Sequence, residues 1–89
     1  MSYSVIDALS NPVRLKLLIC LTNGRKNVSG LIDKCGLSQS AVSQHLEKLK
    51  SAGLVSTESE GKYVYYSLTS PKTARIAQEI LKFTDELSE

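Results

Sequence analysis

The stretch between residues 27 and 53 carries two helical hydrophobic patterns separated by a very short break. A residue that favours helix N-caps precedes each pattern, Asn27 and Ser38 respectively. The apolar positions are Val28, Leu31, Ile32 and Cys35 in the first pattern and Val42, Leu46 and Leu49 in the second. The break contains Gly36, which suits the left-handed residue that commonly ends a helix. The spacing therefore predicts a helix-turn-helix over residues 27–52.

The flanking segments predict further helices and a hairpin. Residues 3–10 favour a short helix, and Asn11-Pro12 starts another that stops at Asn23-Gly24. After Gly53 the apolar period changes to about 2, which predicts strands over 54–58 and 62–68 joined by residues 59–61. A last helix is predicted over 71–88. We expect one domain over 1–89, mainly α with a small β-hairpin, in the order α-α-α-α-β-β-α.

Size and composition exclude several classes of protein. The 89 residues carry 11 Lys and Arg, 9 Asp and Glu, and 42% apolar residues, enough for one core but too few for most catalytic clefts. No nucleophile with a matched histidine or carboxylate is evident, so we do not expect an enzyme. The longest apolar run is Leu17–Leu21, and no signal peptide begins the chain, which predicts a cytoplasmic protein without a membrane partner.

The outer face of the second helix of the pair is small and polar. Residues 11–70 hold eight basic and four acidic side chains, so this part of the chain suits an anionic partner. Side chains near the start of such a helix reach base edges in the DNA major groove. The base-reading candidates are Gln39, Ser40, Ser43 and Gln44. The candidates for contact with the DNA backbone are Ser38, His45, Lys48, Lys62 and Arg14. An ordinary solvated helix face remains the alternative interpretation.

Four segments resemble the ArsR/SmtB-type bacterial repressors. Residues 7–15 are similar to the opening of that family, 36–46 to its recognition helix, and 52–55 with 60–68 to its wing. The resemblance implies a winged helix-turn-helix homodimer that binds a twofold-symmetric operator in double-stranded DNA and blocks transcription. The wing departs from the family in carrying Glu58 and Glu60, where relatives often carry Arg or Lys.

The terminal segments are the candidates for the dimer interface. The apolar stripe of the 71–88 helix is wider than a small core needs, and we expect it to pack with residues 3–10 in a dimer over 1–10 and 71–89. The candidate contacts are Val5, Ile6, Leu9, Ile76, Ile80, Phe83 and Leu87. Alternatively, the stripe only covers the core of its own domain.

The chain has few residues that could form a metal or thiol sensor. Members of the family often bind metals at two places, which match residues 28–32 and the last helix here. Residues 28–32 have no thiol and residues 71–89 have no His, so we expect no metal and no cofactor. Some relatives pair a Cys on the second helix with one on the last, where Thr84 stands here. Cys20 and Cys35 could form a redox pair only if their Cα atoms lie within ~7 Å, and inert packing is the alternative. The inducer is unknown.

A sequence-specific DNA-binding repressor is therefore the preferred interpretation of the chain. The rival is a winged-helix module that binds another protein through the same helix face or through the 76–87 stripe.

Overall fold

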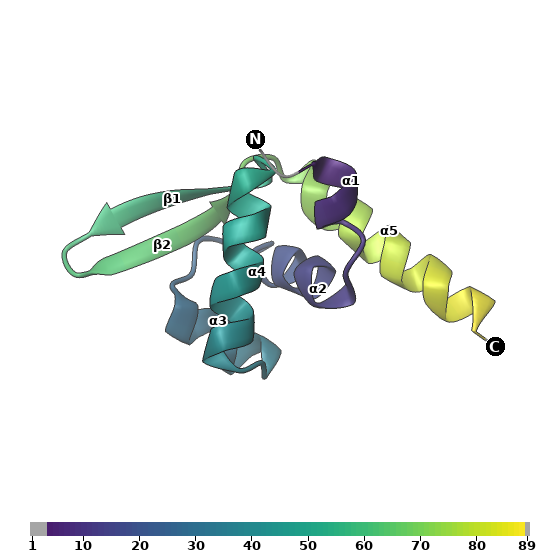
Figure 1. Cartoon of the computed structure of the whole chain (residues 1–89), viewed down its shortest axis with the longest axis horizontal. Helices are drawn as coiled ribbons and strands as arrows, with labels where there is room; N and C mark the ends of the chain where they lie inside the picture. Colours follow the sequence, from purple (N-terminus) through teal and green to yellow (C-terminus); the bar gives the residue numbers. More distant parts are fainter. Residues whose placement is uncertain (1–3, 89) are drawn as a thin grey trace.

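A computed structural model describes residues 4–88 of the chain (Figure 1). Five helices and one hairpin follow in the predicted order, so the predicted fold class is confirmed. The elements are α1 (Val5–Ala8), α2 (Pro12–Cys20), α3 (Val28–Cys35), α4 (Gln39–Ser51), β1 (Val55–Glu60), β2 (Tyr63–Leu68) and α5 (Lys72–Leu87). Residue 3, where the first helix was expected to begin, lies outside the described residues.

Each of the three helices α2, α3 and α4 begins at a side-chain cap that the sequence predicted. The Oδ1 atom of Asn11 accepts hydrogen bonds from the amides of Val13 and Arg14 at 2.8 and 3.2 Å. Asn27 accepts one from Gly30, and Ser38 accepts one from Ala41. These bonds satisfy amides that a helix leaves unpaired at its start. The caps therefore fix where each helix begins, including the first turn of α4.

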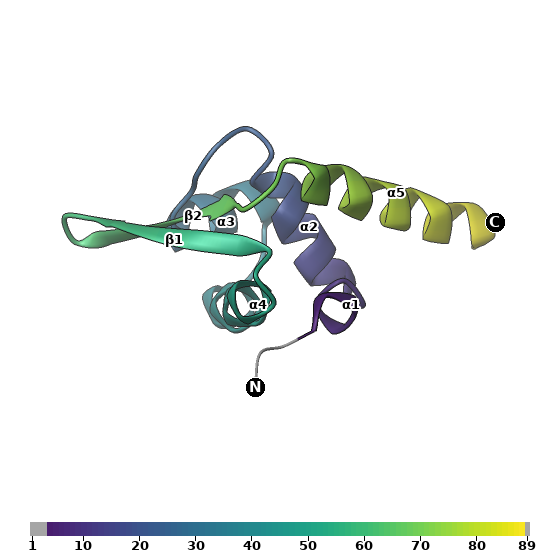
Figure 2. The ribbon, with the colours of Figure 1, turned by 90° about the horizontal axis from the view of Figure 1, so that it is seen from above.

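The core forms around α2, which lies between α5 on one side and α4 on the other (Figure 2). Apolar residues from α2, α3 and α4 are completely buried there: Leu17, Leu18, Leu31, Val42, Leu46 and Leu49. Ala77 of α5 is also fully buried, and it packs against the same cluster. Every inward position predicted for α4 is thus confirmed, and the outer face of α4 is left free of core contacts.

The hairpin differs from the prediction at its turn. β1 continues to Glu60, and the antiparallel register pairs Ser59 with Val64 and Glu60 with Tyr63. Only Gly61 and Lys62 join the strands, because Gly61 adopts a φ of 62° that a two-residue turn requires. The predicted three-residue connection over 59–61 was therefore wrong. A separate bridge pairs Lys26 with Tyr66, which attaches the loop before α3 to the hairpin.

The terminal helices are arranged differently from each other. The first half of α5 buries Thr73, Ala74 and Ala77, and its second half projects beyond the rest of the molecule (Figure 1). α1 is a single turn and lies on the far side of α2 from α5 (Figure 2). No helix within residues 4–88 has both the length and the apolar character that crossing a bilayer requires.

Candidate nucleic-acid interface

The N-terminal half of α4 presents a polar face to solvent. Its inner side is anchored by Val42 and Leu46, which are fully buried. The four predicted base-reading residues are all exposed: Gln39, Ser40, Ser43 and Gln44. Within residues 4–88 none of these four side chains hydrogen-bonds to another protein group. Their donors and acceptors are therefore available to a partner, and the helix that carries them is held rigidly from behind.

Three predicted backbone-contact residues are exposed at the edges of this face. Ser38 uses its hydroxyl to cap α4, with Oγ 3.3 Å from the Ala41 amide. Lys48 is exposed one turn beyond Gln44. Lys62 is exposed at the tip of the hairpin, where its Nζ lies 5.6 Å from the ring centroid of Tyr63. Lys48 lies in the last turn of α4 and Lys62 in the hairpin turn, and positive charge at both positions suits phosphate groups.

Arg14 needs a correction, because it is 4% exposed and its guanidinium is directed into the protein. Its Nε donates to the carbonyl oxygen of Ala8 and its Nη2 to that of Asp7, both at 2.8 Å. Its Nη1 lies 3.2 Å from Nδ1 of His45. The carbonyls at the end of α1 therefore hold this guanidinium, and Arg14 supports α4 from inside instead of contacting phosphate.

His45 is partly buried behind the polar face. Its pKa is lowered, first because burial penalises the charged ring and then because Arg14 and Lys48 are positively charged. The ring is consequently neutral at pH 7 and does not supply a positive charge to a phosphate. His45 is better placed to orient Arg14 than to bind DNA by charge.

Arg25 is a charged residue beside the wing that the sequence patterns did not single out. It lies in the loop before α3 and forms ion pairs with Glu58 and Glu60 of β1, the second with Nη2 2.6 Å from Oε2. Its guanidinium carbon also lies 4.2 Å from the ring centroid of Tyr65. The pKa of Arg25 is raised, first by its hydrogen bond with Glu60. Arg25 thus offsets the acidic side chains that distinguish this wing. The only signal in the sequence was the pair of acidic residues in a wing where relatives often carry Arg or Lys.

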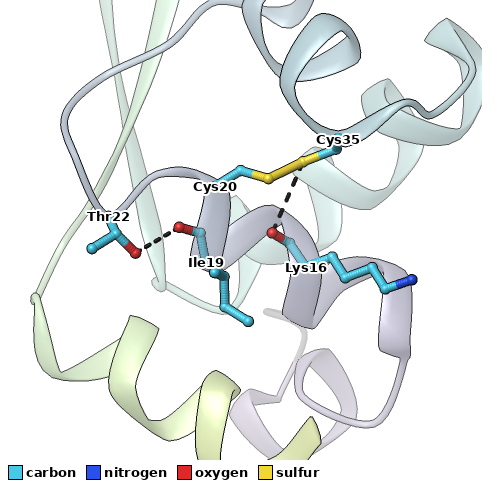
Figure 3. The surroundings of a disulfide bond; sticks show 5 residues. All are labelled: Lys16, Ile19, Cys20, Thr22 and Cys35. Atoms are coloured by element: carbon cyan, nitrogen blue, oxygen red, sulfur yellow. Dashed lines mark hydrogen bonds between the residues drawn. A yellow bond between two sulfur atoms is a disulfide. The ribbon is translucent and has the colours of Figure 1, made fainter.

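The two cysteines meet at the ends of two helices. Cys20 ends α2 and Cys35 ends α3, and a disulfide joins them with a Cα–Cα distance of 6.8 Å (Figure 3). The distance condition set by the sequence is therefore met. Among residues 4–88 no three His, Cys, Asp or Glu side chains group in a way that could hold a metal ion.

The predicted dimer residues fall into two groups. Five are exposed although they are large and apolar: Val5, Ile6, Ile76, Phe83 and Leu87. Leu9 and Ile80 are half-buried and line a hollow of about 380 Å³ between α5 and the α1–α2 junction. Five of the seven residues are therefore available to a second protein surface, and the other two lie at its edge.

Comparison with known proteins identifies this arrangement. The family model described as "Bacterial regulatory protein, arsR family" matches residues 11–57, which include α2, α3 and α4. The chain belongs to the ArsR family. The relatives it resembles include the nodulation protein NolR of Rhizobium meliloti, 44% identical over 71 residues that make up 80% of this chain and 58% of NolR. The transcriptional regulator NmtR of Mycobacterium tuberculosis is 36% identical over 94% of this chain and 70% of NmtR.

A solved ArsR-type structure has the same architecture. The transcriptional repressor BigR from Xylella fastidiosa superposes with a TM-score of 0.76 at 33% identity, covering 88% of this chain and 80% of BigR. The predicted winged helix-turn-helix is thus confirmed, and so is the expected membership of the ArsR family of bacterial regulatory proteins.

Proposed function

We propose that this ArsR-family chain is a homodimeric repressor that binds a twofold-symmetric DNA operator in the cytoplasm. The observation that carries the proposal is the two-sided character of α4. Its apolar side is completely buried, while Gln39, Ser40 and Ser43 are exposed at its first turns. A rigid helix with free amide and hydroxyl groups at its start suits the major groove, where each base pair offers a distinct pattern of donors and acceptors.

Two copies are needed because one helix-turn-helix reads only half of a typical operator. Twofold pairing spaces two recognition helices by about one turn of DNA, roughly 34–36 Å. Ile76, Phe83 and Leu87 are 40%, 59% and 69% exposed along α5, and Ile6 of α1 is 82% exposed. Burying these side chains against a second copy would remove apolar surface from water, which favours association.

The residues of the interface have different roles, which follow from their positions and charges. The side chains at the start of α4 provide sequence discrimination, and Lys48 and Lys62 bind phosphates irrespective of sequence. Arg25 keeps the wing from repelling DNA, because it offsets Glu58 and Glu60. Arg14 and His45 act behind the helix, where they fix its position relative to α1.

The test is the salt dependence of binding to a duplex that the protein selects from a random-sequence pool. If the protein neutralises several phosphates, log Kd rises with log salt by about 0.9 per phosphate contacted. The selected sequence should consist of two inverted half-sites. A protein with negligible duplex affinity even at low salt would instead be the protein-binding module that the sequence left as the rival.

A further inference from the structure

The disulfide fastens the helix that precedes the recognition helix. Cys35 is the last residue of α3, and only Gly36 and Leu37 separate it from Ser38, which caps α4. Its partner Cys20 is the last residue of α2, the helix at the centre of the core. Figure 3 shows the bond crossing directly between these two helix ends. The bond therefore ties the turn of the helix-turn-helix to the core.

The other contacts at this end of α3 are made by partly buried side chains, Ile32 and Leu37, which pack against the core. The helix has eight residues, and Leu31 is its only fully buried side chain. Val28 and Ile32 are half-buried. Helices this short are not stable alone, so tertiary contacts decide whether α3 keeps its position. Its first turn is held by Asn27 and by the nearby Lys26–Tyr66 bridge. At the other end of α3 the disulfide adds a covalent restraint to the packing of Ile32 and Leu37.

The short turn couples the end of α3 to the DNA-reading face of α4, which consists of Gln39, Ser40, Ser43 and Gln44. Gly36 has a φ of 69°, and its amide donates to the carbonyl oxygen of Ile32 at 2.8 Å, so it follows the end of α3 closely. The first reading residue, Gln39, comes three residues later. The far half of α4 is fixed separately by Leu46 and Leu49. Movement at Cys35 would therefore change the first turn of α4 more than its last.

We propose that Cys20 and Cys35 form a thiol–disulfide exchange site that controls DNA affinity, with the oxidised protein as the tighter binder. The proposal rests on the proposed function, because it concerns regulation of the same DNA-reading face. Disulfides inside reducing compartments are usually transient or redox-sensing, which favours a regulatory role over a purely structural one. Both cysteines are only partly buried, so a small thiol can reach the bond.

The chemistry is a two-electron exchange with a dithiol. One thiolate of the reductant attacks one sulfur of the bond, and the other cysteine leaves as a thiolate that takes up a proton. The second thiolate of the reductant then attacks the mixed disulfide and releases the first cysteine. The protein ends with two thiols and the reductant with its own disulfide. Oxidation is the reverse exchange with a disulfide of the same class.

Reduction loosens the reading face for a geometric reason. Reduction removes the covalent link between Cys20 at the end of α2 and Cys35 at the end of α3. The thiol of reduced Cys35 is only a weak donor, and the carbonyl oxygen of Lys16 lies 4.0 Å from its sulfur, so this contact does not replace the covalent bond. The end of α3 then samples more positions, and binding DNA must order it again. Preorganisation by the bond removes that cost, so the oxidised form binds more tightly.

The experiment compares the full chain after oxidation with oxidised glutathione and after reduction with dithiothreitol. Iodoacetamide labelling read by mass spectrometry reports how many thiols are free in each sample. Fluorescence anisotropy then measures affinity for the selected duplex. We expect no labelling and tight binding in the oxidised sample. The reduced sample should carry two labels and bind between about 5-fold and 150-fold more weakly, the usual range of coupling between sites. The C20S/C35S variant should bind like the reduced protein and ignore dithiothreitol.

The outcomes separate the switch from the function on which it rests. Equal affinity of the two wild-type samples, or two free thiols after oxidation, would overturn the switch while leaving DNA binding intact. No duplex binding in either state would overturn the proposed function and the coupling with it. Circular dichroism of the C20S/C35S variant shows whether it is folded, and the wild-type comparison stands independently of that variant.

Discussion

Arg14 of α2 and His45 of α4 are in hydrogen-bond contact, with Nη1 3.2 Å from Nδ1. A guanidinium can only donate, so Nδ1 must be the unprotonated acceptor and the ring is neutral with its proton on Nε2. The same guanidinium donates to the carbonyl oxygens of Asp7 and Ala8. One buried side chain therefore connects the end of α1 to the recognition helix.

This contact makes the stability of the protein depend on pH. The pKa of His45 is lowered from its ordinary value of 6.5, mainly by burial and further by Arg14 and Lys48. Below pH 6.5 the unfolded chain binds a proton at His45 that the folded protein does not bind, so the free energy of unfolding decreases as the pH falls through 6.5. The stability that comes from keeping this ring neutral is fully present above pH 6.5. Thermal unfolding should therefore show a larger loss between about pH 7.5 and about pH 5 for the wild type than for His45→Gln. Identical pH profiles would mean that this ring does not titrate differently on folding.

Arg25 should matter for DNA affinity more than for folding. Its ion pairs with Glu58 and Glu60 join exposed side chains, and such pairs add little to stability. We expect Arg25→Ala to leave the melting temperature nearly unchanged and to weaken duplex binding several-fold at low salt, because two uncompensated carboxylates would then face the phosphates. Adding Glu58→Gln and Glu60→Gln to the variant should restore affinity. If affinity stays low after that restoration of charge, Arg25 acts through some contact other than charge neutralisation.

Substitutions in the DNA-reading face of α4 and in the wing should have different effects on sequence specificity. Gln39→Ala and Ser43→Ala each remove hydrogen-bonding groups from the start of α4, and each should reduce discrimination among duplexes by about 1–3 kcal/mol. Lys62→Ala removes a sequence-independent contact, so it should weaken all duplexes alike and lower the salt slope by about 1. The measurement is competition among single-base variants of the selected duplex at several salt concentrations. Unchanged sequence preference in both α4 variants would show that another surface reads the bases.

The disulfide should also contribute to global stability. It closes a loop across a sequence separation of 15 residues, for which loss of chain entropy in the unfolded state predicts about 3 kcal/mol. Urea denaturation with and without dithiothreitol measures the difference. The C20S/C35S variant is the matched control, because its stability should not respond to the reductant. A wild-type protein whose midpoint does not move on reduction would contradict this estimate.

Sequence patterns predicted local structure better than contacts between distant segments. The caps at Asn11, Asn27 and Ser38 and the inward positions of α4 follow from rules that act within one helix, and all of them are confirmed. Arg14 was misjudged because its burial depends on carbonyl oxygens that only the fold brings to it. The pairing of Arg25 with Glu58 spans 33 residues, and no local pattern reports it.

The turn of the hairpin and the cysteine pair also depend on contacts between distant segments, which local sequence patterns do not report. Residues 59–61 look like a turn in isolation, yet Ser59 and Glu60 pair with β2 because Gly61 permits a shorter connection. The sequence could set the distance that a Cys20–Cys35 bond requires, but the packing of α2 against α3 decides that distance. Helical periodicity alone does not report how far apart two helices end.

The exposed stripe of α5 leads to a prediction about assembly. Phe83 is 59% exposed on the projecting part of the helix, beside Ile76 and Ile80. We expect Phe83→Glu to place a charge in the dimer interface and to dissociate the dimer, because burying an unpaired carboxylate is costly. Sedimentation equilibrium should then give a mass near the 9.7 kDa of one chain, whereas the wild type should give about twice that value.

The matched control is Lys82→Glu, which changes the charge one position away. Successive residues advance by about 100° around a helix, so Lys82 lies away from the stripe that contains Ile76 and Phe83. This variant should remain dimeric and should bind the selected duplex. The Phe83→Glu monomer should lose most of its affinity for a two-half-site duplex, because each half-site must then be bound separately, and it should bind a single half-site about as well as the wild type. A wild type that sediments as a monomer at micromolar concentration would exclude α5 as a dimer element.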